Sequence, residues 1–374
     1  MTDQQARDAL PLKWGSVEPG VIPAWVAEMD YFLAPVVEEA VVAAVRRGTT
    51  GYPPRDDTPV GTAFAGFAER HWGWTPPADA VVVTGDVLAA ITLAFEVLCP
   101  PGPVVVPLPS YPPFLQVVGV AGRDLVPVVT DPDADAVTLE LPALERAFAD
   151  GARTLLLCSP HNPLGRVWTR AELEQLRDLT ASYGVRVVVD EIHGPLTLPG
   201  ATFTPYLTVD PTAILVTSAS KGFNTAGLHT AFLMTLDPDE RERLRSVPLP
   251  MNHSFSPLGM LAAVTAYDQG DAWLAALVQR LDEQRARLAE LLDDLLPEAR
   301  MRPLQATYLP WVDLRAYGVA DPAEAGRPHG VLPAPGGDFQ PGLDGHVRLN
   351  IATSAERLTL MVERLAAAVT DGTP

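Results

Sequence analysis

Lysine is scarce in this chain, which makes the position of each lysine informative. Lys13 and Lys221 are the only lysines among 27 basic residues. Arginine pairs with anions as lysine does, but it keeps its proton near neutrality and cannot act as an amine nucleophile. A GC-rich genome that replaces lysine by arginine explains the depletion, yet it leaves open why two lysines remain.

Lys221 lies in Thr217-Ser-Ala-Ser-Lys-Gly-Phe-Asn224, directly after the apolar run Ala213–Thr217. That run predicts a buried strand, and open α/β sheets bind ligands at the carboxyl ends of their strands. A lysine fixed at such a position can form an imine with a carbonyl compound. The alternative is a surface lysine in a polar turn.

Asp190 ends a second apolar run, Val187-Val-Val-Asp-Glu-Ile-His193. Burying an unpaired carboxylate costs on the order of several kcal/mol. Asp190 therefore either faces a cation, such as a protonated pyridine nitrogen, or caps the following turn. His193 lies three residues further on and either reaches the same site or has a structural role.

Other polar and aromatic residues follow further predicted strands. Asn162 lies in a loop with two prolines and a glycine, where it offers a neutral donor or forms only a rigid turn. The amides of Gly85-Asp86-Val87 precede an apolar helix and can bind phosphate, with Asp86 capping the helix and pointing aside. Tyr111 can stack on a planar ring, although ordinary packing is the alternative.

Two more candidates lie away from these strand ends. Tyr52 is in the loop Thr50-Gly-Tyr-Pro53, and ordinary packing is again the alternative. Arg348 lies in the strand pattern His346-Val-Arg-Leu-Asn350. A bidentate arginine suits an α-carboxylate, and a surface salt bridge is the alternative.

The charge and hydropathy of the 374 residues exclude several functions. A net charge of −19 repels nucleic acid and anionic lipid. The longest apolar stretch, Val87–Cys99, contains Glu96 and falls short of the roughly 20 residues of a membrane span. Met1–Asp8 is too polar for a signal peptide, and Cys99 and Cys158 cannot build a disulfide framework. We therefore expect a cytoplasmic protein without a metal, a membrane or a nucleic-acid partner.

Short β-branched runs alternate with helical stretches from about residue 80. This alternation indicates a mainly parallel sheet covered by helices on both faces. Helices are predicted at Leu88–Leu98 and Arg170–Tyr183, the latter ended by Gly184. The expected strands are Ala80–Val83, Val104–Val106, Leu125–Val129, Thr154–Cys158, Val185–Val189, Ala213–Thr217 and Thr230–Met234.

The pattern changes after Gly270. Asp271–Leu296 has apolar residues at helical spacing and no internal Pro or Gly, which predicts a long helix that bridges two domains. Tyr308–Leu314 and His346–Ile351 alternate like antiparallel strands, and Ser354–Val369 predicts a final helix. We expect an α/β protein with a three-layer α/β/α large domain (residues 46–270) around a seven-stranded sheet. A smaller α+β domain is expected to combine residues 1–45 and 271–374.

In their order and spacing these features resemble the fold-type I PLP enzymes (PLP, pyridoxal 5′-phosphate) of the aspartate-aminotransferase-like superfamily, class I/II. The resemblance extends from about Trp14 to Leu365. Within that superfamily the chain is similar to the MalY/PatB branch of cystathionine β-lyases, which are C–S lyases. The segments that carry the similarity are Lys13-Trp14, Ile22–Asp30 (IPAWVAEMD), Gly51-Tyr52, Leu155–Pro163 (LLLCSPHNP), Asp190–His193 (DEIH), Ser218–Asn224 (SASKGFN) and Ala306–Trp311 (ATYLPW).

The resemblance implies a role for each matching residue around PLP. Lys221 would carry the cofactor as an imine and then move the substrate Cα proton. Asp190 would pair with the pyridine nitrogen, and Asn162 would donate to the ring hydroxyl oxygen. His193 occupies the position where aminotransferases place a tyrosine for that purpose, and Tyr111 would stack on the ring.

Further implied roles concern the phosphate and the substrate. Ser218 and the amides of Gly85, Asp86 and Val87 would hold the phosphate, and Tyr52 would arrive from the other subunit of a homodimer. Arg348 would bind the carboxylate of a small amino-acid substrate together with Asn162. Trp25, in Trp25–Asp30, would form part of the entrance wall.

The chain departs from the family pattern at three positions. His229 stands where many members have a phosphate-binding arginine, so its charge there would depend on pH. Glu28 replaces the aspartate of the branch motif, and Leu164 replaces the threonine of the common Asn-Pro-Thr-Gly loop. These changes leave the expected cofactor intact and concern the substrate.

The implied reaction is cleavage of cystathionine or cysteine-S-conjugate-like amino acids to a thiol, pyruvate and ammonia. An aminotransferase of class I/II is the first alternative, because it would use the same cofactor residues. A regulatory protein with little turnover on the same fold is the second.

Overall fold

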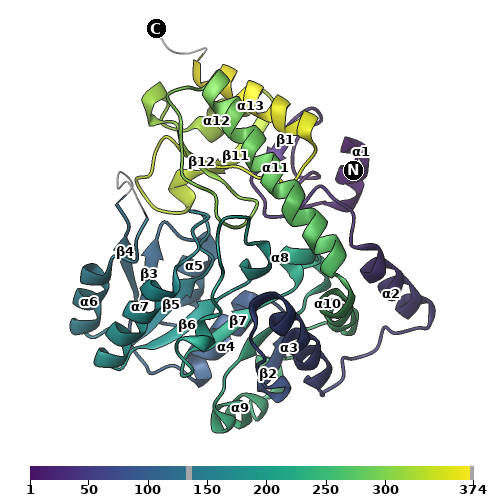
Figure 1. Cartoon of the computed structure of the whole chain (residues 1–374), viewed down its shortest axis with the longest axis vertical. Helices are drawn as coiled ribbons and strands as arrows, with labels where there is room; N and C mark the ends of the chain where they lie inside the picture. The colour runs from purple at the N-terminus through teal and green to yellow at the C-terminus, as the bar shows by residue number, and fades with distance from the viewer. Residues whose placement is uncertain (132–136, 371–374) are drawn as a thin grey trace.

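The computed structural model describes residues 1–131 and 137–370 and contains two sheets with their covering helices (Figure 1). The larger sheet has the order β2-β8-β7-β6-β5-β3-β4. Its pairings are parallel except for those of β8, which is antiparallel to both neighbours. Its strands are β2 (Val81–Thr84), β3 (Val104–Leu108), β4 (Leu125–Val129), β5 (Thr154–Cys158), β6 (Arg186–Asp190), β7 (Ile214–Thr217) and β8 (Ala231–Met234).

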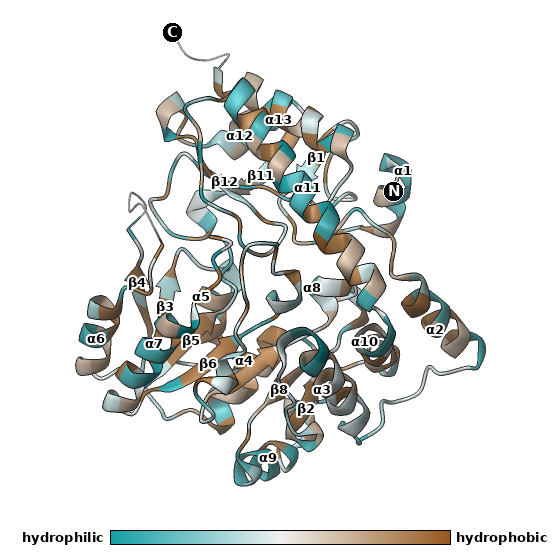
Figure 2. Cartoon of the chain, viewed as in Figure 1, coloured by the Kyte–Doolittle hydropathy of each residue, from teal (hydrophilic) through white to brown (hydrophobic). Residues whose placement is uncertain are grey.

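The mainly parallel seven-stranded sheet expected from the sequence is confirmed. Leu125–Val129 and Thr154–Cys158 have the predicted bounds, and the ends of the other strands differ by at most two residues. Both faces of the sheet are buried: on β5, Leu155 and Leu157 pack into one apolar cluster and Leu156 into the other. The central strands are accordingly apolar on both sides, as the hydropathy colouring shows (Figure 2).

Helices cover the two faces of this sheet and make it the middle of three layers. One face packs against α4 (Val87–Val97), α5 (Pro112–Val120) and α9 (Pro238–Arg245). The opposite face packs against α3 (Thr58–Trp72), α6 (Leu141–Ala149), α7 (Arg170–Tyr183) and α10 (Pro257–Gln269). The predicted helix Arg170–Tyr183 is confirmed at both ends, because Thr169 and Glu172 form a capping box and Gly184 adopts φ 64° at the C-cap.

A second sheet joins one strand from the N-terminal part of the chain to four strands from the C-terminal part. Its order is β1-β11-β12-β10-β9, and β1 pairs with β11 in parallel, so an N-terminal strand joins a C-terminal sheet. The strands are β1 (Ile22–Ala24), β9 (Arg300–Met301), β10 (Trp311–Asp313), β11 (Val331–Pro335) and β12 (His346–Arg348). The domain boundaries at residues 45 and 270 remain a prediction.

The long helix expected after Gly270 is α11 (Asp271–Leu295). It extends from α10 beside the large sheet to α13 (Ala355–Thr370) beside the small sheet (Figure 1). Its buried residues Leu274, Leu277, Leu281 and Leu288 form the inward stripe. The remaining helices are α1 (Asp3–Ala9), α2 (Pro35–Arg46), α8 (Ser220–Phe223) and α12 (Pro322–Gly326).

The strands expected at Tyr308–Leu314 and His346–Ile351 are shorter in the structure. Pairing continues beyond them, since Leu349 N–H donates to the Pro310 carbonyl at 3.0 Å. Pro310 has no N–H to return that bond, and the regular ladder therefore ends at Trp311.

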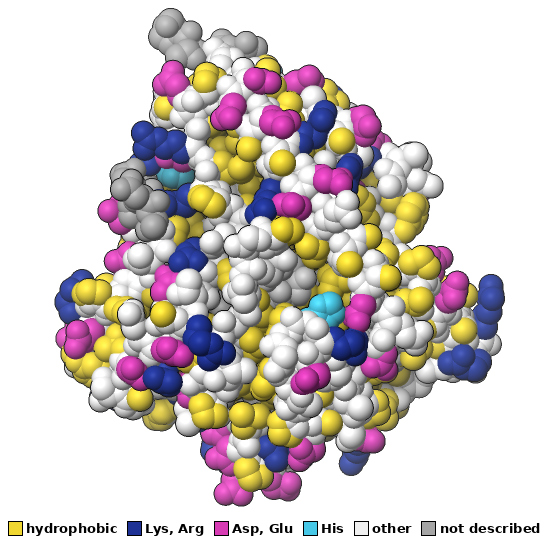
Figure 3. Space-filling view, in the orientation of Figure 1, with side chains coloured by type: hydrophobic (Ala, Val, Ile, Leu, Met, Phe, Trp, Pro, Cys, Tyr) yellow, Lys and Arg dark blue, Asp and Glu magenta, His cyan; other side chains and the backbone are white. Residues whose placement is uncertain are grey.

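The surface carries mixed charges, and Figure 3 shows carboxylates gathered at the lower end of one face, over α9. Within residues 1–131 and 137–370, no helix combines the length and apolar character needed to cross a bilayer.

Candidate active site

A cavity of about 230 Å³ lies at the edge of the large sheet where its parallel strands end. The segments that follow β2, β3, β5, β6 and β7 all contribute to its wall. This convergence follows from the topology, because parallel strands present their carboxyl ends at one edge. Nine of the predicted site residues line the cavity: Gly85, Asp86, Val87, Tyr111, Asn162, Asp190, His193, Ser218 and Lys221.

Lys221 lies in the first turn of α8, directly after β7, and its side chain is directed into the cavity. Its Nζ donates a hydrogen bond of 2.9 Å to the Ala27 carbonyl. Burial lowers the pKa of this amine to about 8, and the nearby Arg348 adds to the effect, while Glu28 and Asp190 oppose it. A larger fraction of the amine is therefore unprotonated near neutrality than in an exposed lysine, as nucleophilic or proton-abstracting chemistry requires.

Asp190 is a buried carboxylate at the end of β6, and few nearby groups stabilise its negative charge. Its Oδ1 accepts a hydrogen bond of 3.0 Å from the Ile192 amide, so it does cap the following turn. Among the residues described, no cationic side chain lies within 4 Å of it, and burial raises its pKa to about 7. A carboxylate in this state is suited to a cationic ligand.

His193 is buried beside Asp190 and Lys221. Burial, reinforced by the charges of Lys221 and Arg348, lowers the pKa of His193 to about 3, so its imidazole is neutral. Its Nδ1 is buried without a hydrogen-bond partner in the described part of the chain. A buried polar atom without a partner is costly and is typical of a site that a ligand completes.

Asn162 lines the cavity, and Arg348 lies directly behind it. Arg348 Nη1 donates to Asn162 Oδ1 at 3.0 Å, and its Nη2 donates to the Trp25 carbonyl at 2.7 Å. The guanidinium lies 4.7 Å from the centroid of the Phe339 ring, and burial lowers its pKa to about 10. Its Nε is buried without a partner within the described residues, which leaves a donor for an incoming anion.

The predicted phosphate site has the expected helix geometry. Asp86 is the N-cap of α4 and its Oδ1 accepts from the Ala89 amide at 2.8 Å, so the predicted cap is confirmed. A Cβ at Gly85 would lie 2.9 Å from the Ser254 carbonyl oxygen, which requires glycine there. Ser218 Oγ donates to the Thr230 carbonyl and accepts from the Ser220 amide, which fixes the hydroxyl at the cavity wall.

Four predicted residues do not line the cavity of this single chain. Tyr52 is fully exposed, and His229 is exposed with φ 48°. Trp25 contributes its backbone carbonyl to Arg348, and its indole Nε1 is buried without a partner in the described part of the chain. Arg348 reaches the site through Asn162.

Sequence reasoning assigned no role to Thr230 or Tyr308. Thr230 lines the cavity together with Ser220 and with Ala27, which belongs to the predicted entrance segment Trp25–Asp30. Buried Tyr308 donates a hydrogen bond to the Ala27 carbonyl at 2.9 Å. Ala27 and Tyr308 both lie in segments that carry the family resemblance, but a backbone carbonyl has no signature in sequence. In the sequence, Tyr308 looks like one more apolar residue of the predicted strand Tyr308–Leu314.

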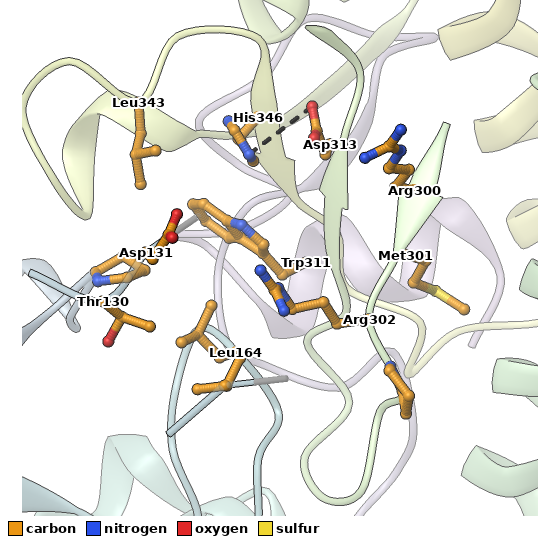
Figure 4. A pocket seen from close by; sticks show the side chains of 13 residues that line it. Thr130, Asp131, Leu164, Arg300, Met301, Arg302, Trp311, Asp313, Leu343 and His346 are labelled. Atoms are coloured by element: carbon orange, nitrogen blue, oxygen red, sulfur yellow. Dashed lines mark ion pairs between the residues drawn. The ribbon is translucent and has the colours of Figure 1, made fainter. Parts of the chain in front are cut away.

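A second cavity of about 240 Å³ lies at the small sheet, beside Trp311 and Leu164 (Figure 4). His346 stacks on Trp311, with ring centroids 5.6 Å apart, and its Nε2 lies 3.8 Å from Asp313 Oδ1. None of the predicted site residues lines this cavity.

Comparison with known proteins agrees with this geometry. Residues 21–365 match the family of aminotransferases of class I and II. The chain is 34% identical to a cystathionine β-lyase of Corynebacterium glutamicum over 97% of this chain and 98% of that protein. It is 33% identical to the cystathionine β-lyase PatB of Bacillus subtilis, over 93% and 92% of the two chains.

A solved structure gives the same result. Cystalysin of Treponema denticola, whose crystal structure contains pyridoxal 5′-phosphate, superposes with a TM-score of 0.90 at 25% identity, over 98% of this chain and 97% of that one. The chain therefore belongs to the aminotransferase class I and II family and, within it, to the group of cystathionine β-lyases that includes PatB.

Proposed function

We propose that this protein is a PLP-dependent C–S β-lyase that acts on cystathionine or cysteine-S-conjugate-like amino acids. It releases a thiol, pyruvate and ammonia. The observation that carries the proposal is the meeting of the Lys221 amine and the buried Asp190 carboxylate at one cavity. The similarity to cystathionine β-lyases over almost the whole chain supports this reaction over others of the family.

The residues present fit PLP. Asp190 lacks a cation that a protonated pyridine nitrogen would supply, and the Lys221 amine has the lowered pKa that attack on an aldehyde needs. Asn162 and His193 would contact the ring hydroxyl, and Tyr111 would stack on the ring face. Ser218 and the amides of Gly85–Val87 are assigned to the phosphate, with His229 and a partner's Tyr52 as further contributors.

PLP supplies an aldehyde that joins amino groups and a ring that withdraws electrons from the substrate Cα. The chain's own residues do the rest. Arg348 and Asn162 bind the substrate carboxylate, which orients the Cα–H bond toward Lys221. The Lys221 amine takes the Cα proton, and the thiolate then leaves from Cβ. One water molecule converts the remaining fragment to pyruvate and ammonia.

The proposal is tested with purified protein, PLP and cystathionine or an S-alkyl cysteine. Pyruvate and free thiol are expected in equal amounts without any added keto acid. Turnover only in the presence of a keto acid would identify an aminotransferase instead. Protein that binds no PLP and releases neither product would favour the regulatory alternative.

Arg348→Lys is expected to raise KM about 10- to 100-fold with a smaller change in kcat. A lysine keeps the charge but loses the planar fork that binds a carboxylate, and charge-assisted hydrogen bonds are worth about 1.5–3 kcal/mol. Steady-state kinetics of pyruvate release measures the change. Arg285→Lys is the matched control, because the Arg285 guanidinium also donates two hydrogen bonds, to the carbonyls of Leu304 and Pro199, but contacts no predicted site residue. An unchanged KM in Arg348→Lys would refute the assigned role.

We further propose that the enzyme acts as a homodimer in which Tyr52 completes the partner's site. Tyr52 is fully exposed, and exposed Leu249 and Met251 lie in a segment tied to the phosphate side of the cavity. That tie consists of a hydrogen bond from Asn252 Nδ2 to the Val83 carbonyl and of the close approach of Ser254 to Gly85. Exposed apolar side chains beside a ligand site are typical of an interface.

Mixing two defective variants, Tyr52→Ala and Lys221→Ala, is expected to restore activity. In a mixed dimer one site has both Tyr52 and Lys221, so random mixing returns about one quarter of wild-type turnover. The measurement is pyruvate release after the chains are exchanged, with mixed dimers isolated through two different tags. Inactive mixed dimers would show that Tyr52 does not act across the interface.

A further inference from the structure

The segment from Trp25 to Met29 is held by side chains that donate to its backbone. Each of its five carbonyls accepts at least one side-chain hydrogen bond. Arg348 donates to Trp25, Asn350 to Val26 and Glu28, Lys13 to Glu28, and Asn224 to Met29. The carbonyl of Ala27, in the middle, accepts from both Lys221 Nζ and Tyr308 Oη, each at 2.9 Å.

We propose that Tyr308 is a positioning residue for Lys221: its hydroxyl fixes the Ala27 carbonyl, and this carbonyl holds the lysine amine where it meets the substrate Cα. The proposal rests on the proposed function, in which the Lys221 amine moves that proton. It assigns Tyr308 no contact with the substrate.

Tyr308 is itself rigidly placed. It is 1% exposed, and its own carbonyl accepts from the Ile351 amide at 3.0 Å. The preceding residue, Thr307, adopts φ 73°, and its hydroxyl accepts from the Leu309 amide. Burial of the ring and these backbone hydrogen bonds restrict how far Tyr308 can move, so its hydroxyl holds the Ala27 oxygen in place.

The shared carbonyl also influences the charge of Lys221. The charged and titratable groups that face the amine are Arg348 from β12, Glu28 from the N-terminal segment, and Asp190 and His193 from the end of β6. A carbonyl oxygen accepts more strongly from an ammonium than from a neutral amine. When Tyr308 also donates to this oxygen, less acceptor strength remains for the ammonium. Removal of the hydroxyl should therefore raise the pKa of Lys221.

The test uses the scarcity of lysine in this chain. Full-length protein is freed of PLP by a carbonyl reagent, and the return of visible absorbance on PLP addition confirms that it remains folded. A small amine-reactive reagent is then applied across a pH series, and labelling of Lys221 is followed by mass spectrometry. Lys13, buried against Asp30, is the internal reference.

In Tyr308→Phe the labelling profile of Lys221 is expected to move to higher pH, with several-fold slower labelling near neutrality. In the reconstituted enzyme kcat is expected to fall about 10- to 100-fold with KM changed less than about two-fold, as for a misplaced catalytic group. Tyr31→Phe is the matched control, because Tyr31 also donates to a backbone carbonyl, that of Thr353, and lines no part of the cavity. It should leave the profile and kcat unchanged.

An unchanged labelling profile and kcat in Tyr308→Phe would overturn the proposal, and so would a rise in KM alone. Equal shifts in both tyrosine variants would show a general structural effect and would also overturn it. The labelling needs no turnover. A wild-type protein that makes no pyruvate would therefore contradict the proposed lyase activity, whereas the Lys221 profile is judged separately.

Discussion

Lys221→Ala is expected to lose turnover by a factor on the order of 10⁴ or more, because one side chain performs two tasks. In the proposed function, its amine would join PLP covalently and then move the substrate Cα proton. The structure supports both tasks, since the amine is buried at the cavity, has a pKa lowered to about 8 and is held by the Ala27 carbonyl. Pyruvate release under saturating PLP measures the loss.

One further variant and one chemical rescue experiment separate the charge of Lys221 from its chemistry. Lys221→Arg retains a cation but no nucleophile, and it should be as inactive as Lys221→Ala. A small primary amine added to Lys221→Ala should restore part of the turnover, because the cavity left by the side chain can admit a soluble base. Residual activity of Lys221→Arg near the wild-type level would contradict the assigned role.

Asp190→Asn is expected to lower kcat by about 10²- to 10⁴-fold, the range of a positioned acid–base group. Asparagine keeps the shape and can still accept from the Ile192 amide, but it cannot balance a cationic pyridine nitrogen. The buried carboxylate has no cation within 4 Å among the described residues, so its negative charge is available for PLP. The spectrum and affinity of bound PLP should change together with kcat.

Glu191→Gln is the matched control for Asp190→Asn. Glu191 is the next residue and is equally buried, with a pKa raised to about 8 by burial. Its Oε1 accepts from the Tyr206 amide, on the other side of the strand end, and a glutamine oxygen can keep that bond. Turnover within a few-fold of wild type is expected. Equal losses in the two variants would indicate a structural effect and would argue against a role for Asp190 at the pyridine nitrogen.

The large sheet was predictable because both of its faces are buried and its strands read as continuous apolar runs. The same regularity located Lys221, Asp190 and Asn162, since each lies within four residues of the end of such a run and parallel strands end at one edge. Convergence of these residues at one cavity follows from topology alone.

The small sheet was harder to predict for a physical reason. Its strand β11 contains Pro333 and Pro335, which cannot donate hydrogen bonds, and yet it lies between β1 and β12. Proline in that stretch argues for a loop when the sequence alone is considered. The strand pairs in parallel with Ile22–Ala24, more than 300 residues away, and no local pattern reveals such pairing.

Parts of the site depend on contacts that a sequence does not encode locally. The Ala27 carbonyl and the Tyr308 hydroxyl meet Lys221 only because three distant segments converge. His229 and Tyr52 are known from the family pattern alone, and both are exposed in the single chain. The mixed dimers test the role of Tyr52, and the role of His229 remains a prediction.

Borohydride reduction of the PLP-bound protein, followed by peptide mass spectrometry, shows whether Lys221 carries the cofactor. The chain has only two lysines, so an adduct on a lysine side chain can be only on Lys13 or Lys221. We expect one reduced PLP adduct, on Lys221, with Lys13 unmodified. An adduct on Lys13, or no adduct on a protein that turns over its substrate, would contradict this expectation.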